Sequence, residues 1–124
     1  MFEHTKAFSG FSVDDIDAAR KFYGETLGIR ASEPGMGLLA LHIAGDRDII
    51  VYPKANHQPA TYTILNFPVD DIDQAVAELS RRGIEFLFYE GFAQDENGIA
   101  RGDEGPPIAW FTDPAGNILS VLEE

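Results

Sequence analysis

The chain contains no cysteine. A disulfide framework, a thiolate nucleophile and a cysteine-ligated metal are therefore all excluded. Its hydrophobic runs are short, and none approaches the roughly 20 residues that a membrane-spanning helix needs. Residues 1–6 are polar, so we expect no targeting segment there and predict a cytoplasmic protein without a membrane partner.

Basic residues are also scarce. Lys and Arg together number 9, against 21 Asp and Glu, and the formal net charge is −12 over 124 residues. Nucleic acid is excluded as a partner, because phosphates require Lys and Arg opposite them. Two interpretations of this acidity stay open: it keeps the protein soluble, or it attracts a cationic ligand.

An internal repeat is the most informative feature that the chain does contain. The pentapeptide Val-Asp-Asp-Ile-Asp occurs at residues 13–17 and again at 69–73, an offset of 56. Each copy follows a strand-like segment, enters an amphipathic helix and stops at Gly-Ile. Such a repeat indicates two copies of one small α+β unit within a single domain, residues 1–124. Module one is expected at about 5–53 and module two at about 60–124.

Local patterns predict the elements of each module. Asp14 is the expected N-cap of the first helix, and Gly28 its end. Residues 54–59 are the expected linker. The predicted strands of module one are 7–13, 29–33, 38–43 and 48–52; module two is predicted to contain strand 61–69, helix 71–82 and strands 85–89, 107–112 and 117–122.

Module two is longer than module one. The closing strands align at an offset of 70, so module two carries 14 additional residues, which fall within 90–105. This stretch is glycine-rich and acidic, with few expected core residues. A loop of this length in a compact domain is usually functional or disordered, so a lid over a pocket and an unstructured insertion are both open interpretations.

Two motifs match a known family. The residues of the first are Val13, Asp15, Ile16, Ala19, Phe22, Tyr23, Leu27 and Gly28, and those of the second are Phe111, Asp113, Pro114, Gly116 and Asn117. Together with the repeat, they resemble the vicinal oxygen chelate superfamily, which contains glyoxalase I, the extradiol dioxygenases and the bleomycin resistance proteins. The resemblance implies two βαβββ modules that form a cup-shaped mixed sheet, with the helices outside and a ligand inside.

The resemblance also implies four positions at which family enzymes hold a divalent metal. These positions lie on the first and last strands of each module, and here they carry Phe8, Ile50, Ile64 and Ser120. A catalytic metal needs about three strong protein ligands and an open position. Phenylalanine and isoleucine have no donor atom, so we predict no metal and no cofactor at this site.

Strand parity predicts which side chains line the cup. Trp110 and Phe8 are candidates for stacking on a flat or cationic ligand, although core packing is the alternative interpretation of both. His42 is a candidate general acid or base, and we predict no other catalytic residue. The predicted ligand-binding residues are Phe8, Ser12, His42, Ile50, Tyr52, Ile64, Asn66, Trp110, Thr112 and Ser120.

We therefore expect a metal-free protein that binds a small organic molecule, with a cation as one candidate, as in the bleomycin resistance branch. The alternative is a glyoxalase-like lyase, isomerase or dioxygenase that uses a displaced metal, or acid–base chemistry through His42, Asp48 or Tyr52. A regulatory or accessory domain is a third possibility. The resemblance further implies a homodimer.

Overall fold

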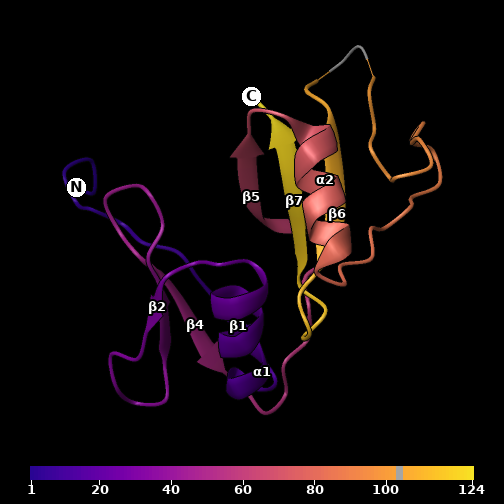
Figure 1. The fold of residues 1–124 in the computed structure, drawn as a ribbon. Helices are drawn as coiled ribbons and strands as arrows, with labels where there is room; N and C mark the ends of the chain where they lie inside the picture. The colour runs from indigo at the N-terminus through magenta and orange to yellow at the C-terminus, as the bar shows by residue number, and fades with distance from the viewer. Residues whose placement is uncertain (103–104) are drawn as a thin grey trace. The chain divides into compact units, whose positions relative to one another are not determined.

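A computed structural model describes residues 1–102 and 105–124 of the chain. The chain divides into two compact units, Met1–Pro59 and Ala60–Glu124, which are described separately below (Figure 1). The predicted α+β class, with two tandem copies of one unit, is confirmed. Within the described residues, no helix is long and apolar enough to cross a membrane.

Unit one is a four-stranded sheet with one helical segment. Its strands are β1 (Gly10–Val13), β2 (Ala31–Ser32), β3 (Leu39–Leu41) and β4 (Ile49–Pro53), and its helices are α1 (Ile16–Lys21) and the π-helical η1 (Phe22–Thr26). The strand order is β1-β4-β3-β2. β1 and β4 are parallel, and the other pairs are antiparallel.

The repeated pentapeptide builds the same strand-to-helix corner in both units. Asp15 is the N-cap of α1, and its carboxylate accepts hydrogen bonds from the backbone N–H groups of Asp17 and Ala18. Asp71 caps the helix of unit two in the same extended conformation, with φ of −135° at both residues. The prediction of Asp14 as N-cap is wrong by one residue, because it is the Asp15 carboxylate that reaches the N–H groups of the first turn.

Side-chain contacts show which face of the first sheet carries the helix. The rings of Phe11 and Tyr23 have centroids 5.7 Å apart, so the odd-numbered residues of β1 point toward the helical segment. The even-numbered residues point to the opposite face, which we call the helix-free face. The buried apolar residues of unit one include Val13, Ala19, Tyr23, Leu39, Leu41, Ile49 and Val51.

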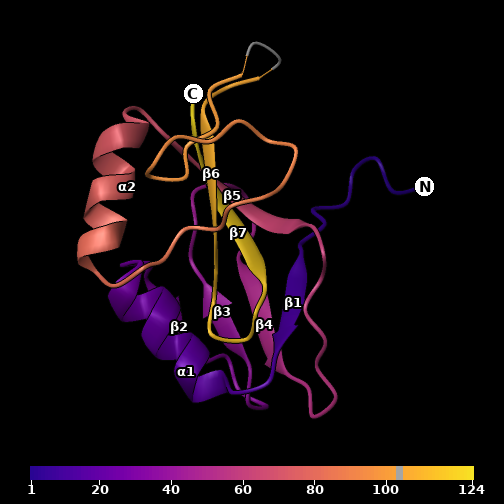
Figure 2. The same cartoon turned by 90° about the vertical axis from the view of Figure 1, so that its right-hand side faces the viewer.

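Unit two is a three-stranded sheet with one helix. Its elements are β5 (Thr63–Val69), α2 (Ile72–Arg81), β6 (Ile108–Thr112) and β7 (Ile118–Glu123), with the strand order β5-β7-β6 (Figure 2). The Glu123 carboxylate accepts a 3.0 Å hydrogen bond from the backbone N–H of Ile72, so the odd-numbered residues of β7 face α2. Ser120 and its neighbours at i±2 therefore lie on the helix-free face of this sheet.

The strand predicted at 85–89 is not formed. Leu87 donates one backbone hydrogen bond to the Trp110 carbonyl, at 2.8 Å, but no ladder follows. Instead, the side-chain amide of Gln94 accepts from the Tyr89 N–H at 2.8 Å and donates to the carbonyls of Leu87 and Gly98 at 2.9 and 2.8 Å. A side chain thus satisfies backbone groups that a strand partner would have satisfied.

The insertion in module two contributes two apolar residues to the core. Ile99 and Ala100 are 1% and 7% exposed. Ala100 and Ile108 exchange backbone hydrogen bonds of 2.8 and 3.1 Å, which places this segment beside β6, as both views show (Figures 1 and 2). Asp103 and Glu104, which belong to the predicted loop, lie outside the described residues.

Candidate functional site

Strand register places much of the predicted lining of module one on a single face. Ile50 pairs with both Gly10 and Ala40, and Ser12 pairs with Tyr52. All these residues lie on the helix-free face of the first sheet. Tyr52 is 39% exposed.

Phe8 does not belong to β1, although the sequence predicts a strand from residue 7. The strand begins at Gly10, where the parallel register with Ile50 starts. The Phe8 side chain is 55% exposed, and the Arg47 guanidinium lies 4.5 Å from its ring centroid. Phe8 therefore already stacks on a cation, and strand parity does not fix its direction.

His42 lies in a chain of hydrogen bonds on the helix-free face of unit one. Its Nδ1 is 3.0 Å from the Asp48 carboxylate, and its Nε2 is 2.7 Å from the Ser32 hydroxyl. The ionised carboxylate only accepts, so Nδ1 carries the proton of the neutral ring, and Nε2 accepts the Ser32 O–H. The side chains of His42 and Asp48 are 25% and 44% exposed, and Ser32 is exposed.

A second serine–histidine pair lies in the same unit. The Ser12 hydroxyl is 2.6 Å from Nδ1 of His57, in the segment predicted as a linker. Ser12 pairs with Tyr52 across β1 and β4, so this polar contact borders the same face as His42.

In unit two, three of the predicted residues form a row across the sheet. Ser120 of β7 pairs with Asn66 of β5 on one side and with Trp110 of β6 on the other. The Ser120 hydroxyl donates a 2.5 Å hydrogen bond to the Asn66 side-chain oxygen. Thr112 lies on the same face, opposite Ile118. The structure thus brings Asn66, Trp110, Thr112 and Ser120 together.

Ile64 lies where the register of β5 is irregular. Thr63 pairs with Ile118, but Leu65 pairs with Leu119, so Ile64 has no partner in β7. Such a bulge changes the alternation of side chains. The parity that predicts Ile64 in the lining therefore does not extend past Leu65.

An aromatic cluster surrounds Trp110. The ring centroids of Tyr89 and Phe92 each lie 5.3 Å from that of Trp110, and the Tyr89 ring stands edge-on to the indole. Phe92 is 56% exposed, and burial raises the pKa of the Tyr89 hydroxyl. Half-buried aromatic side chains next to hydrogen-bonding groups are typical of sites for small organic molecules.

The four positions that would hold a metal do not have the chemistry for one. Phe8, Ile50 and Ile64 offer no lone pair, and the hydroxyl of Ser120 is donated to Asn66. Elsewhere in residues 1–102 and 105–124, no three His, Asp or Glu side chains gather in a way that could hold a metal ion. The residues present do not fit the family's metal centre.

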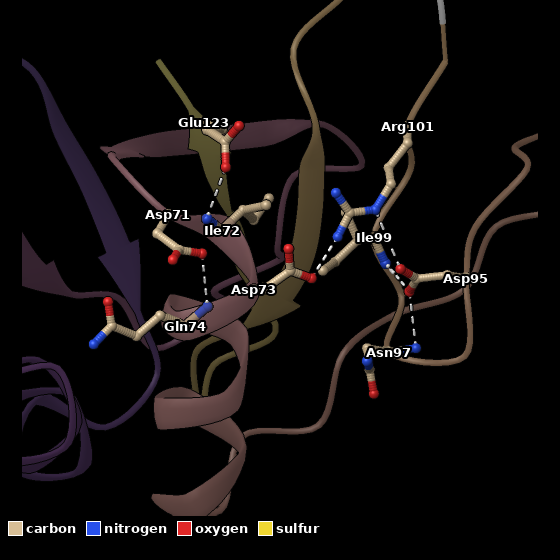
Figure 3. Close-up of polar contacts among 9 residues, drawn as sticks. All are labelled: Asp71, Ile72, Asp73, Gln74, Asp95, Asn97, Ile99, Arg101 and Glu123. Atoms are coloured by element: carbon tan, nitrogen blue, oxygen red, sulfur yellow. Dashed lines mark hydrogen bonds and ion pairs between the residues drawn. The ribbon is translucent and has the colours of Figure 1, made fainter.

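The insertion is tied to the start of α2 (Figure 3). Arg101 bonds to the Asp73 carboxylate at 2.5 Å and to the Asp95 carboxylate at 3.4 Å. Burial works to raise the pKa of Asp95, but the N–H groups of Ile99 and Asn97, together with Arg101, hold that pKa below its usual range. These contacts join residues 95–101 to one another and to the start of α2.

A hollow of about 410 Å³ lies on the helix side of unit two, away from the predicted ligand-binding residues. Arg82 and Arg81 hold the pKa of its Glu78 carboxyl below the usual range. The hollow is lined by Val69, Asp70, Asp71, Gln74, Ala75 and Glu78.

Sequence reasoning missed several residues of these faces. The sequence predicts the turn between β2 and β3 at 34–37, which sets Ser32 opposite Leu39 and on the other face; its observed partner is Ala40. Tyr89 is predicted in a strand and Phe92 in a loop, so neither is predicted to line a site. The aromatic residues at 86, 88, 89 and 92 lie close together in the sequence, and this spacing was the available signal for an aromatic cluster.

Comparisons with known proteins agree with this fold. The family model of the Glyoxalase/Bleomycin resistance protein/Dioxygenase superfamily matches residues 2–121, and the chain therefore belongs to this superfamily. No curated protein matches the chain in sequence.

Solved structures of the same fold span the whole chain. A superfamily member from Sphaerobacter thermophilus DSM 20745 is 23% identical, covers 100% of both chains and has a TM-score of 0.74. A glyoxalase family protein from Enterococcus faecalis is 22% identical, covers 99% of this chain and 100% of its own, and has a TM-score of 0.70. TnmS3, an antibiotic binding protein from Streptomyces sp. CB03234, is 23% identical, covers 97% of both chains and has a TM-score of 0.69.

Proposed function

We propose that this protein binds a small organic molecule without a metal, on the helix-free faces of its sheets. One observation carries the proposal: the positions that hold a metal in family enzymes are Phe8, Ile50, Ile64 and Ser120, and they supply a single hydroxyl that is already bonded to Asn66. Antibiotic binding by a structural relative is consistent with this role.

The proposed ligand is flat and positively charged. Trp110 and Phe92 offer aromatic faces, and the net charge of −12 favours a cation. Asn66 and Thr112 are the proposed hydrogen-bonding groups on the face of unit two that carries Trp110, and Ser12, His42 and Tyr52 are those on the helix-free face of unit one. The protein is further proposed to be a cytoplasmic homodimer that works as one domain, residues 1–124.

Trp110 is the only tryptophan of the chain, so its fluorescence reports directly on this face. We expect 9-aminoacridine, a flat cation, to quench that fluorescence saturably, while flat anthracene-2-sulfonate does not. In calorimetry, Trp110→Ala is expected to weaken 9-aminoacridine binding by roughly 10- to 30-fold, since a desolvated cation–π contact is worth about 2 kcal/mol. Equal affinity of both probes, or unchanged affinity in Trp110→Ala, would contradict the proposal.

The second candidate is a glyoxalase-like enzyme. The hydrogen-bonded chain from Asp48 through His42 to Ser32 favours it, because an oriented imidazole with an accepting Nε2 is equipped for proton transfer. A lyase, isomerase or dioxygenase acting through a displaced metal has no comparable support among the described residues.

A further inference from the structure

We propose that Ser32, His42 and Asp48 form a nucleophilic triad that hydrolyses activated carboxylic esters. The Ser32 hydroxyl lies 2.7 Å from His42 Nε2, and the Asp48 carboxylate lies 3.0 Å from His42 Nδ1. This is the order and spacing of serine, histidine and aspartate that activates a serine for acyl transfer, and it recurs on unrelated folds. The inference goes beyond the binding role, and it does not depend on a ligand at Trp110.

The backbone of the sheet holds the three residues in place. Leu41 pairs with Ile49 at the end of the β3–β4 ladder, and His42 and Asp48 are the residues that directly follow β3 and directly precede β4. His42 donates its backbone N–H to the Arg30 carbonyl at 2.8 Å, and Ser32 lies two residues further along the same strand face. The three side chains therefore come from the end of β2 and from the two ends of the loop that joins β3 to β4, where the flanking strands fix the backbone.

Access and charge also suit the reaction. Ser32 is exposed and belongs to β2, the edge strand of the sheet, so an ester can approach its hydroxyl from solvent. Arg30 is exposed and directly precedes β2, two residues before Ser32. A guanidinium that reaches the ester oxygen stabilises the negative charge that develops there during attack, and this is the role proposed for Arg30.

The proposed hydrolysis has two stages. The Ser32 oxygen adds to the carbonyl carbon of the ester while its proton passes to His42 Nε2. The carbon–oxygen bond to the leaving alcohol breaks, and that alcohol takes the proton from His42. Water then attacks the acyl-serine in the same way, and the carboxylic acid is released. Asp48 acts as a positioning residue that holds the ring and stabilises its charged form.

The test is labelling of the full-length protein with a fluorophosphonate, in which the serine oxygen displaces fluoride from phosphorus. We expect one phosphonyl group per chain by intact mass, located on Ser32 by peptide mapping. Ser32→Ala is expected to abolish labelling, and His42→Ala to slow it roughly 100-fold, as is typical for loss of a general base. Ser80→Ala, which removes an exposed serine of α2, is the matched control and is expected to label at the wild-type rate.

The role of Asp48 is tested by measurements that distinguish positioning of the His42 ring from an effect on folding. Asp48→Asn is expected to slow labelling by about fivefold, because a carboxylate that is partly exposed to water orients its partner less strongly than a buried one. Asp48→Glu is expected to recover part of the rate, with unchanged circular dichroism in both variants. Absence of labelling in the wild-type protein, labelling at another residue, or equal labelling of Ser32→Ala would overturn the inference.

Discussion

Replacing Asp113 by alanine is expected to lower the free energy of unfolding by about 3 kcal/mol, because the hydrogen bonds that its buried carboxylate accepts are lost. The Asp113 side chain accepts from the backbone N–H groups of Ala115 and Asn117 at 3.0 and 2.8 Å and from the Asn117 side-chain amide at 3.0 Å. The residue is 3% exposed, so water does not replace these partners. Urea denaturation monitored by circular dichroism measures the change.

The same substitution at Asp46 is the matched control. Asp46 is exposed in the turn before β4, so Asp46→Ala removes an identical charge from the surface. We expect it to change stability by less than about 0.5 kcal/mol. If Asp113→Ala unfolds at the same urea concentration as Asp46→Ala, the carboxylate does not hold the β6–β7 hairpin together.

Gln94→Glu is expected to destabilise unit two by a similar amount, about 3 kcal/mol at neutral pH. The amide nitrogen of Gln94 donates to the carbonyls of Leu87 and Gly98, and a carboxylate at that position cannot donate to either. The hydrogen bond from the Tyr89 N–H remains available. Amide hydrogen exchange should therefore accelerate in residues 87–100 more than in β7.

The pH dependence of this variant provides a second test. Protonation restores a donor, so the pKa of the introduced carboxyl in the folded protein lies above its unfolded value. The loss of stability relative to the wild-type protein is therefore complete above the pKa that this carboxyl has in the folded protein. The loss should become smaller as the pH falls from neutrality toward about 5. Gln58→Glu, which adds the same charge at an exposed position, is the control. If the loss of stability in Gln94→Glu does not change with pH, the lost hydrogen bonds to the carbonyls of Leu87 and Gly98 are not its cause.

The architecture could be predicted from the sequence because the repeat carries its own local signals. Each copy contains a helix N-cap aspartate, an apolar helical stripe and a terminal glycine with positive φ, 71° at Gly28 and 91° at Gly83. These signals act over one or two turns of chain, so they need no tertiary information. The one-residue error at Asp14 arises because both Asp14 and Asp15 are good caps by type, and only backbone conformation separates them.

The missing strand at 85–89 could not be predicted, because a side chain from the insertion that follows it bonds to its backbone. Residues 85–89 have the apolar and aromatic composition of a strand, but Gln94 bonds to the backbone of Leu87 and Tyr89. That contact depends on how the insertion folds back, and a pattern of period two carries no information about it.

The candidate site was predictable in part. Parity within a regular strand places Asn66, Trp110 and Ser120 on one face, and their register confirms it. Parity across a turn is less secure, since one residue more or less in the turn reverses every side chain beyond it. The β2–β3 turn contains three consecutive residues with positive φ, Gly35, Met36 and Gly37, a geometry that composition alone does not specify. Ser32 was missed for that reason.

The most direct test of the metal-free account is native mass spectrometry of the purified protein. The spectrum is recorded as purified and after incubation with zinc, nickel, iron(II) or manganese, with calcium as a measure of non-specific adducts on a chain of net charge −12. We predict no stoichiometric metal, and adducts no more abundant than those of calcium. One tightly held metal per chain, lost in His42→Ala, would contradict the account and favour an enzyme with a displaced metal centre.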